Sequence, residues 1–166
     1  MFCCFKRTVH PKDKKDKKDT IDVDTIVYHG TLQKFEPNDI LPPSWFSLEE
    51  DQSVKWIYYR YKKLNTTEPK TGYLHKFIVI NAPNLIDINS DSDLRLEINA
   101  NGNRYFTEKI KRGEYGNYDG YLNMEDQAEL MLCEPSKVLK VIETTKINIE
   151  KVEKMNYQKT VKGWRL

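Results

Sequence analysis

Three short segments of the sequence carry side chains that could bind and activate a small polar ligand. In the first, His29 and Gly30 follow the β-branched and aromatic run Thr25-Ile26-Val27-Tyr28. An imidazole would then lie beside a stretch of backbone without a side chain, which a planar ligand can approach closely. A histidine–glycine pair after a strand is also common in ordinary turns, so this segment alone does not define a site.

The second segment has a tryptophan on each side of a strand-to-helix turn. Trp45 lies in the short predicted strand 44–47, and Trp56 lies in the helix predicted to follow it. Two indoles in these places could hold a flat ring between them, although core packing is the more common use of aromatic side chains.

The third segment is the apolar strand predicted over 128–133, where Glu129 stands among hydrophobic residues. Taking a carboxylate out of water is costly unless it has a partner or a function. Alternate residues of a strand share a face, so Gln127 and Glu129 would point the same way. An edge-strand glutamate in water is the plain alternative.

A metal site is not expected. The sequence has no CxxC or HxxxH spacing, and its histidines are only His10, His29 and His75. Structural zinc sites need such clustered ligands. We interpret Cys133 as a small buried hydrophobic residue.

The composition indicates one domain with charged ends. The chain has 166 residues, of which 39% are hydrophobic, enough for one modest core. Residues 1–20 and 146–166 each carry a net charge of +4, which leaves −6 on residues 21–145. A domain that grips nucleic acid would normally hold the positive charge itself, so nucleic acid is disfavoured as a partner of the core.

We therefore divide the chain into a basic, disordered tail (1–20), a folded domain (21–145) and a basic extension (146–166). Phe2-Cys3-Cys4-Phe5 next to basic residues is typical of a reversible acylation site that would attach the protein to a membrane; a pair of exposed thiols is the alternative. No apolar run is long enough to span a bilayer or to form a signal peptide, so we expect an intracellular, cytoplasmic monomer.

The elements that must position the three segments follow from periodicity and turn residues. A helix is predicted to open at Glu49 and Glu50 and to run to about residue 63, with Ser47 as N-cap and Val54, Ile57, Tyr58 and Tyr61 on one face. Weaker helical patterns cover 91–99 and 105–112, the second ending at Gly113. Further strands are expected at 72–80, 85–88, 118–122 and 138–142. Because strands and helices do not alternate regularly, we predict an α+β fold with a largely antiparallel sheet.

Taken in order, the three segments resemble the ADP-ribosyltransferase superfamily, in its His-Tyr-Glu branch of poly- and mono-ADP-ribose polymerases. Tyr28-His29-Gly30-Thr31 resembles the first motif of that branch, and Trp45-Phe46-Ser47 resembles its tyrosine strand, with Trp in place of Tyr. The segment 129–135 resembles the strand of the catalytic glutamate, and 113–121 resembles a Gly-Tyr-Asp-Gly turn of small bacterial and viral members. Gln127-x-Glu129 is instead similar to the toxin branch, which leaves the target open.

The resemblance implies a fold of split antiparallel sheets around an NAD cleft with flanking helices, and a mono-ADP-ribosyltransferase that releases nicotinamide and uses no metal. Glu129 would stabilise the transition state, and Gln127 would contact a protein or other macromolecular acceptor. His29, also expected to be catalytic, would hold the adenosine-side ribose with Thr31, and the Gly30 backbone would hold the carboxamide. Trp45 and Trp56 would enclose the nicotinamide ring. The same resemblance adds Phe46, Ser47 and Ser53 to the NAD-binding residues.

Two other functions stay open at this point. An RNA 2′-phosphotransferase shares the implied fold, but it needs basic residues in its cleft and no catalytic glutamate. A non-catalytic interaction module would keep the fold and lose the NAD chemistry, and Trp45 in place of Tyr is the feature that favours it.

Overall fold

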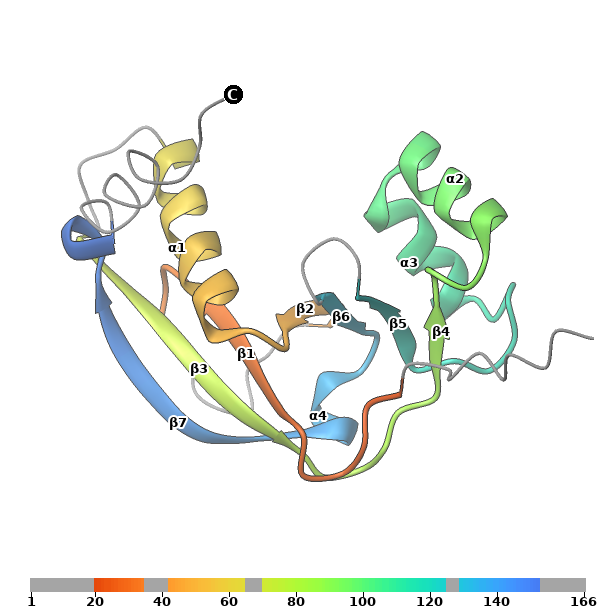
Figure 1. The fold of residues 1–166 in the computed structure, drawn as a ribbon, viewed down its shortest axis with the longest axis horizontal. Helices are drawn as coiled ribbons and strands as arrows, with labels where there is room; N and C mark the ends of the chain where they lie inside the picture. The colour runs from red at the N-terminus through yellow and green to blue at the C-terminus, as the bar shows by residue number, and fades with distance from the viewer. Residues whose placement is uncertain (1–19, 35–41, 65–69, 125–128, 153–166) are drawn as a thin grey trace, which may run out of the picture.

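The computed structural model describes residues 20–34, 42–64, 70–124 and 129–152. In this part of the chain a seven-stranded sheet runs through the protein, and its three longer helices stand at two separate places along the sheet (Figure 1). The strands are β1 (Ile26–Thr31), β2 (Ser44–Ser47), β3 (Thr71–Val79), β4 (Leu85–Asp87), β5 (Gly120–Asn123), β6 (Glu129–Leu132) and β7 (Leu139–Asn148). The helices are α1 (Glu50–Leu64), α2 (Ser92–Asn101), α3 (Asn103–Lys111) and the short α4 (Pro135–Val138).

The sheet has the order β4-β5-β6-β2-β1-β3-β7 and is antiparallel except for the pair β4–β5. The predicted α+β fold with a largely antiparallel sheet is therefore confirmed. The described strands form one sheet, not two separate ones. Its weakest junction lies between β1 and β2, which are joined at Tyr28↔Ser47 alone, whereas β1 and β3 pair along six residues.

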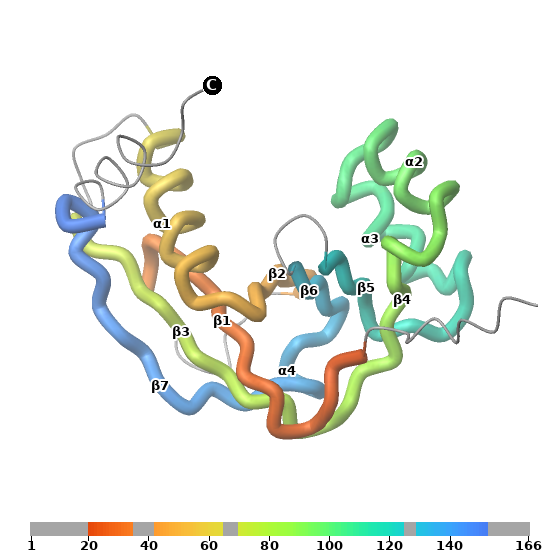
Figure 2. The backbone as a smooth tube through the Cα atoms, viewed as in Figure 1, coloured from red at the N-terminus to blue at the C-terminus, as the bar shows by residue number. Residues whose placement is uncertain are grey.

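The two faces of the sheet are covered differently. One buried cluster lies on the face of the sheet away from α1, and it contains Val27, Phe46, Phe77, Leu130 and Leu132. These side chains alternate along their strands with the ones that face α1. On the opposite face α1 packs through Ile57 against Leu74. Further along that face, Phe106 of α3 packs on Tyr121 and Met131. Figure 2 shows α1 and the α2–α3 pair standing apart on the same side of the sheet, with β2 and β6 between them.

Several predicted boundaries are wrong. The strand β1 continues through His29, Gly30 and Thr31, where a turn was expected, because β3 pairs with it as far as Thr31↔Tyr73. The strand β7 extends to Asn148, beyond the predicted end at 142 and beyond the domain boundary at 145. The basic charge of this segment suggested a tail, yet its β-branched residues pair with β3. The helix α4 was not predicted.

The described part of the chain contains no helix that is both long and apolar enough to cross a membrane. Cys3, Cys4 and most of the two predicted terminal segments lie outside the described residues, so the expectations about acylation and disorder stay predictions. Ile149 and Val152, placed in the basic extension by the sequence, are buried. The folded domain therefore reaches at least to residue 152.

Close contact between α1 and β1 depends on Gly30. A Cβ atom built on Gly30 would lie 2.2 Å from the backbone carbonyl oxygen of Ser53 and 2.8 Å from a side-chain carbon of Ile57. A Cβ atom on Gly72 of β3 would lie 2.2 Å from a methyl group of Ile57, and the nearest backbone atom, the carbonyl oxygen of Thr31, would be 3.3 Å away. A methyl group can move with its side chain, but a helix backbone cannot move without displacing the helix.

We expect the substitution Gly30→Ala to lower the free energy of unfolding by about 1–3 kcal/mol, because the added methyl group pushes α1 away from the sheet. Gly72→Ala is the matched control and should cost less, since Ile57 can adjust. Urea denaturation followed by circular dichroism measures both. Equal stability of Gly30→Ala and the wild type would contradict this packing.

Candidate functional site

Three adjacent strands bring Trp45, Tyr121 and Glu129 onto one face of the sheet. Met131 of β6 is paired on one side with Trp45 of β2 and on the other with Tyr121 of β5. Glu129 lies two residues before Met131 on the same strand, so its side chain points to the same face. Residues that are 76 positions apart in sequence, Trp45 and Tyr121, are in this way placed within hydrogen-bonding distance.

A chain of hydrogen bonds holds the carboxylate of Glu129. The indole Nε1–H of Trp45 donates to the hydroxyl oxygen of Tyr121 at 3.0 Å, and this hydroxyl donates to Glu129 Oε1 at 2.7 Å. The amide Nδ2 of Asn103, the first residue of α3, donates to the same oxygen at 3.5 Å. Burial and the neighbouring carboxylate raise the pKa of Tyr121, so its hydroxyl keeps the proton that it donates. Glu129 is thereby fixed in one orientation.

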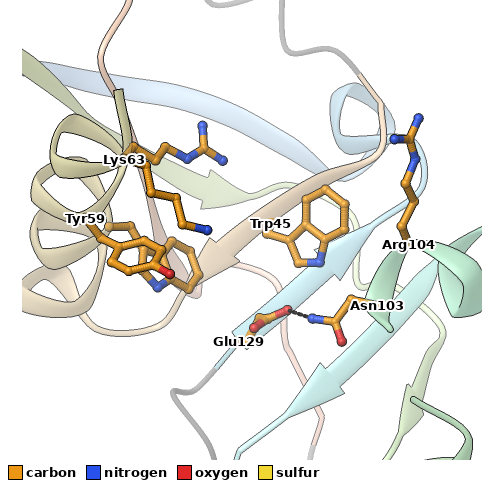
Figure 3. A pocket seen from close by; sticks show the side chains of 8 residues that line it. Trp45, Tyr59, Lys63, Asn103, Arg104 and Glu129 are labelled. Atoms are coloured by element: carbon orange, nitrogen blue, oxygen red, sulfur yellow. Dashed lines mark hydrogen bonds between the residues drawn. The ribbon is translucent and has the colours of Figure 1, made fainter. Parts of the chain in front are cut away.

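Glu129 lies in a cleft of about 530 Å³ between α1 and α3. Trp45 and Glu129 come from the sheet, and Trp56 and Tyr59 come from α1. In Figure 3, Tyr59 and Lys63 lie on the α1 side, Arg104 lies on the opposite side, and Asn103 points toward Glu129. The cleft thus combines aromatic surfaces with one oriented carboxylate.

The cleft is also cationic. Arg60 and Lys63 of α1 and Arg104 of α3 line it, and within the described residues none of the three forms an ion pair with a carboxylate. Lys63 lies over the ring of Tyr59, with its Nζ 4.6 Å from the ring centre. Some cations elsewhere do have acidic partners, for example Lys109 with Glu97 at 2.6 Å. Unpaired cations gathered around a cleft favour an anionic ligand.

The structure does not bring His29 into this cleft. Gly30 faces α1, so the alternating side chain of His29 points to the other face, where its ring lies 5.5 Å from that of Phe46. Its Nδ1 is 2.7 Å from the carbonyl oxygen of Trp45. Because a carbonyl oxygen only accepts, Nδ1 carries the proton. Burial lowers the pKa of His29 and favours the neutral ring. The hydrogen bond from His29 to the Trp45 carbonyl connects β1 to β2 next to Tyr28↔Ser47, the position at which the two strands pair.

The remaining predicted site residues have structural surroundings. Phe46 is 0% exposed and packs in the core, so no ligand can contact it in this structure. The prediction that Phe46 binds NAD is therefore wrong. The Ser47 hydroxyl accepts from the backbone N–H of Glu49, just before α1, instead of capping the helix directly. Ser53 is buried against Gly30. Thr31 is nearly buried, and its hydroxyl accepts from the N–H of Gln33. Gln127 lies outside the described residues.

Sequence reasoning missed several residues of the cleft. Tyr121 was placed in a strand but given no role, although its hydroxyl donates to Glu129 at 2.7 Å. The cations were missed because the net charge of residues 21–145 is negative, and net charge does not show where positive side chains gather. A helical wheel places Trp56, Arg60 and Lys63 on neighbouring positions of one face, which is the signal that was available.

The described residues contain no cluster of three or more histidine, cysteine, aspartate or glutamate side chains arranged for a metal ion. Comparisons with protein-family models, with curated proteins and with solved structures give no match for this chain. What the cleft does must therefore be argued from its own geometry.

We expect Tyr121→Phe to lower the free energy of unfolding by about 1–3 kcal/mol, because the indole N–H of Trp45 loses its acceptor and Glu129 loses a donor. Tyr118→Phe is the matched control, since Tyr118 packs in the same cluster and its hydroxyl forms no hydrogen bond with the described residues; its effect should stay within about 0.5 kcal/mol. Chemical denaturation gives both values. If Tyr121→Phe is no more destabilising than Tyr118→Phe, the hydrogen-bond chain does not stabilise the fold.

Proposed function

We propose that the protein is a mono-ADP-ribosyltransferase, which transfers ADP-ribose from NAD to a macromolecular acceptor and releases nicotinamide. The observation that carries this proposal is the oriented carboxylate of Glu129 in a cleft lined by two tryptophans and three unpaired cations. Each of these features matches one part of NAD, as the following paragraphs explain.

The carboxylate would act on the reacting ribose. As the bond between ribose and nicotinamide breaks, positive charge develops on the sugar in an oxocarbenium-like transition state. A carboxylate that is already oriented stabilises this charge without reorganising, which is worth a few kcal/mol. Tyr121 and Asn103 supply that orientation through their hydrogen bonds to Oε1. The second oxygen of Glu129 would accept a hydrogen bond from the ribose 2′-OH.

The walls of the cleft would bind the rest of the dinucleotide. Arg60 and Lys63, both on α1, would neutralise the pyrophosphate, for which guanidinium and ammonium groups are suitable donors. Trp45 and Trp56 would contact the nicotinamide ring, because both line the cleft that contains Glu129. No metal ion is needed in this scheme, since the developing charge is positive and the groups that meet it belong to the protein.

The sheet supports an ADP-ribosyltransferase-like arrangement, in which the split between antiparallel sheets would correspond to the junction of β1 and β2. Their pairing at Tyr28↔Ser47 does not extend to Gly30. The backbone edge of Gly30 on the β2 side could then bind the carboxamide of nicotinamide. In this proposal His29 is a positioning residue that holds the Trp45 backbone, and it does not touch the reacting atoms.

An RNA 2′-phosphotransferase is the second candidate, and the three cations of the cleft favour it. Glu129 disfavours it, because a carboxylate at the centre of the cleft would repel the phosphate that such an enzyme removes. An RNA oligonucleotide with an internal 2′-phosphate distinguishes the two: the second candidate requires NAD-dependent loss of that phosphate.

We expect Glu129→Gln to lower the rate of nicotinamide release about a hundredfold or more while NAD binding persists, because the amide keeps the shape of the side chain but not its charge. Glu134→Gln is the matched control, since Glu134 is exposed and pairs only with Lys137 in the described structure. Nicotinamide is measured by chromatography and NAD binding by calorimetry. Normal turnover in a folded Glu129→Gln protein would remove Glu129 from the reaction.

A double substitution tests the cationic wall. Arg60→Gln combined with Lys63→Gln should weaken NAD binding about tenfold or more, as expected for the loss of charge-assisted hydrogen bonds to a phosphate. Lys55→Gln, on the same helix but outside the cleft, should have no effect. Calorimetric titrations at low and high salt provide the measurement. An affinity for NAD that depends on neither the substitutions nor the salt would place the pyrophosphate elsewhere.

A further inference from the structure

A second cavity adjoins Glu129 on the side away from α1. It has a volume of about 320 Å³ and lies between α2, the start of α3 and the ends of β4 and β5. Glu129 and Asn103 line both this cavity and the cleft, so the carboxylate stands at the boundary of the two spaces. A group bound in the second cavity would therefore reach the sugar that Glu129 contacts in the first.

The second cavity is lined by amide side chains. Asn89 and Asn99 face it along with Asn103 and Asn123, and Arg95 adds a cation. One of these amides lacks a partner: the Oδ1 of Asn89 accepts from Arg95 at 3.2 Å, but its buried Nδ2 donates no hydrogen bond. Because this Nδ2 is shielded from solvent, the groups that a ligand in the cavity can reach are the other amides of the lining and Arg95, which together offer both donors and acceptors.

The remaining walls indicate the shape of that ligand. Ile88 and Ile98, 3% and 9% exposed, give the cavity a small apolar floor beside the amides. A flat ring placed between apolar side chains, with donors and acceptors around its edge, is the chemistry of a nucleobase. Asparagine amides and arginine are the side chains that read base edges most directly, because each offers paired hydrogen-bonding atoms in one plane.

Two observations favour a nucleic acid over a protein as the source of this ring. The cleft beside the cavity collects Arg60, Lys63 and Arg104, although residues 21–145 have a net charge of −6. Because these cations gather at the cleft, the negative net charge of residues 21–145 does not argue against nucleic-acid binding there. In addition, two phosphates of NAD require fewer charges than the cleft and cavity supply together, so Arg104, next to Asn103, can meet a phosphate of the acceptor.

We infer that the cavity bounded by Asn89, Asn99 and Glu129 binds a base of a single-stranded nucleic acid as the acceptor of ADP-ribose; this inference rests on the proposed function. A single strand is required because a base in a duplex cannot enter a pocket without leaving its stack. The adenine of NAD is a poor occupant, since the pyrophosphate holds it away from the ribose next to Glu129.

The reaction balances without a further reagent. A nitrogen of the base forms a bond to C1′ of the nicotinamide ribose as the bond from C1′ to nicotinamide breaks. The electron pair of the broken bond moves to the pyridinium nitrogen, so neutral nicotinamide leaves. The proton of the acceptor nitrogen passes to Glu129 and from there to water.

The test uses the full chain with fluorescein-labelled single-stranded oligonucleotides of each base, the corresponding duplexes, and short peptides carrying each nucleophilic side chain. Asn99→Phe fills the cavity from the exposed surface of α2, and Asn101→Phe places the same ring on α2 outside the cavity. Anisotropy without NAD measures binding. Mass spectrometry with NAD measures the added ADP-ribose, and calorimetry measures NAD binding separately.

The inference expects saturable binding of single strands with a preference for one base, and ADP-ribose on that base. Asn99→Phe should weaken binding and lower the ratio of transferred ADP-ribose to released nicotinamide at least about tenfold, a change of about 1.4 kcal/mol. Asn101→Phe should match the wild type.

Three results would overturn the inference. The first is nicotinamide release with modification of peptides and not of oligonucleotides. The second is weaker NAD binding in Asn99→Phe with no change for oligonucleotides, which would assign the cavity to NAD itself. The third is absent oligonucleotide binding, or binding that Asn99→Phe leaves unchanged. Absence of NAD binding in the wild type would instead refute the proposed function, while the anisotropy measurement without NAD would still decide whether the cavity holds a base.

Discussion

The hydrogen bond from Tyr121 to Glu129 is the interaction on which the candidate site depends. A carboxylate at the start of an otherwise apolar strand loses hydration, and that loss must be offset by donors within the protein. Tyr121 supplies one at 2.7 Å and is itself 1% exposed. The indole N–H of Trp45 donates to the oxygen of the same hydroxyl, so the hydroxyl proton is directed at Glu129. The three side chains therefore stabilise one another.

This arrangement in turn constrains the backbone. Trp45, Tyr121 and Glu129 meet only if β2, β6 and β5 keep their observed register, because a shift by one residue would turn each side chain to the other face. Gly120 shows how closely β5 approaches β6: a Cβ atom there would lie 1.8 Å from the carbonyl oxygen of Met131. The packing of α3 adds Asn103 from above. The register of these strands and the packing of α3 thus fix the position of the Glu129 carboxylate.

The sequence predicted the elements well where a local pattern decides them. The apolar face of α1 and the alternation of β2 are such patterns, and both elements lie close to their predicted limits. The prediction failed where the structure of a segment depends on pairing with a strand far away in the sequence. The extension of β7 to Asn148 depends on pairing with β3, and the role of Tyr121 depends on a strand pairing that no local pattern reveals. The two tryptophans and Glu129 were found from sequence, whereas Asn103 and the cations required the folded chain.

The structure leads to a different interpretation of Trp45 from the one that the sequence suggests. In the sequence it replaces a tyrosine of the resembled family and so removes a hydroxyl group beside the expected ligand. In the structure a hydroxyl is present nevertheless, because Tyr121 brings its own to the carboxylate from β5. The indole N–H orients that hydroxyl, a task that a phenylalanine could not perform. Trp45 is therefore part of the machinery that orients Glu129, and its presence no longer favours an inactive module over an enzyme.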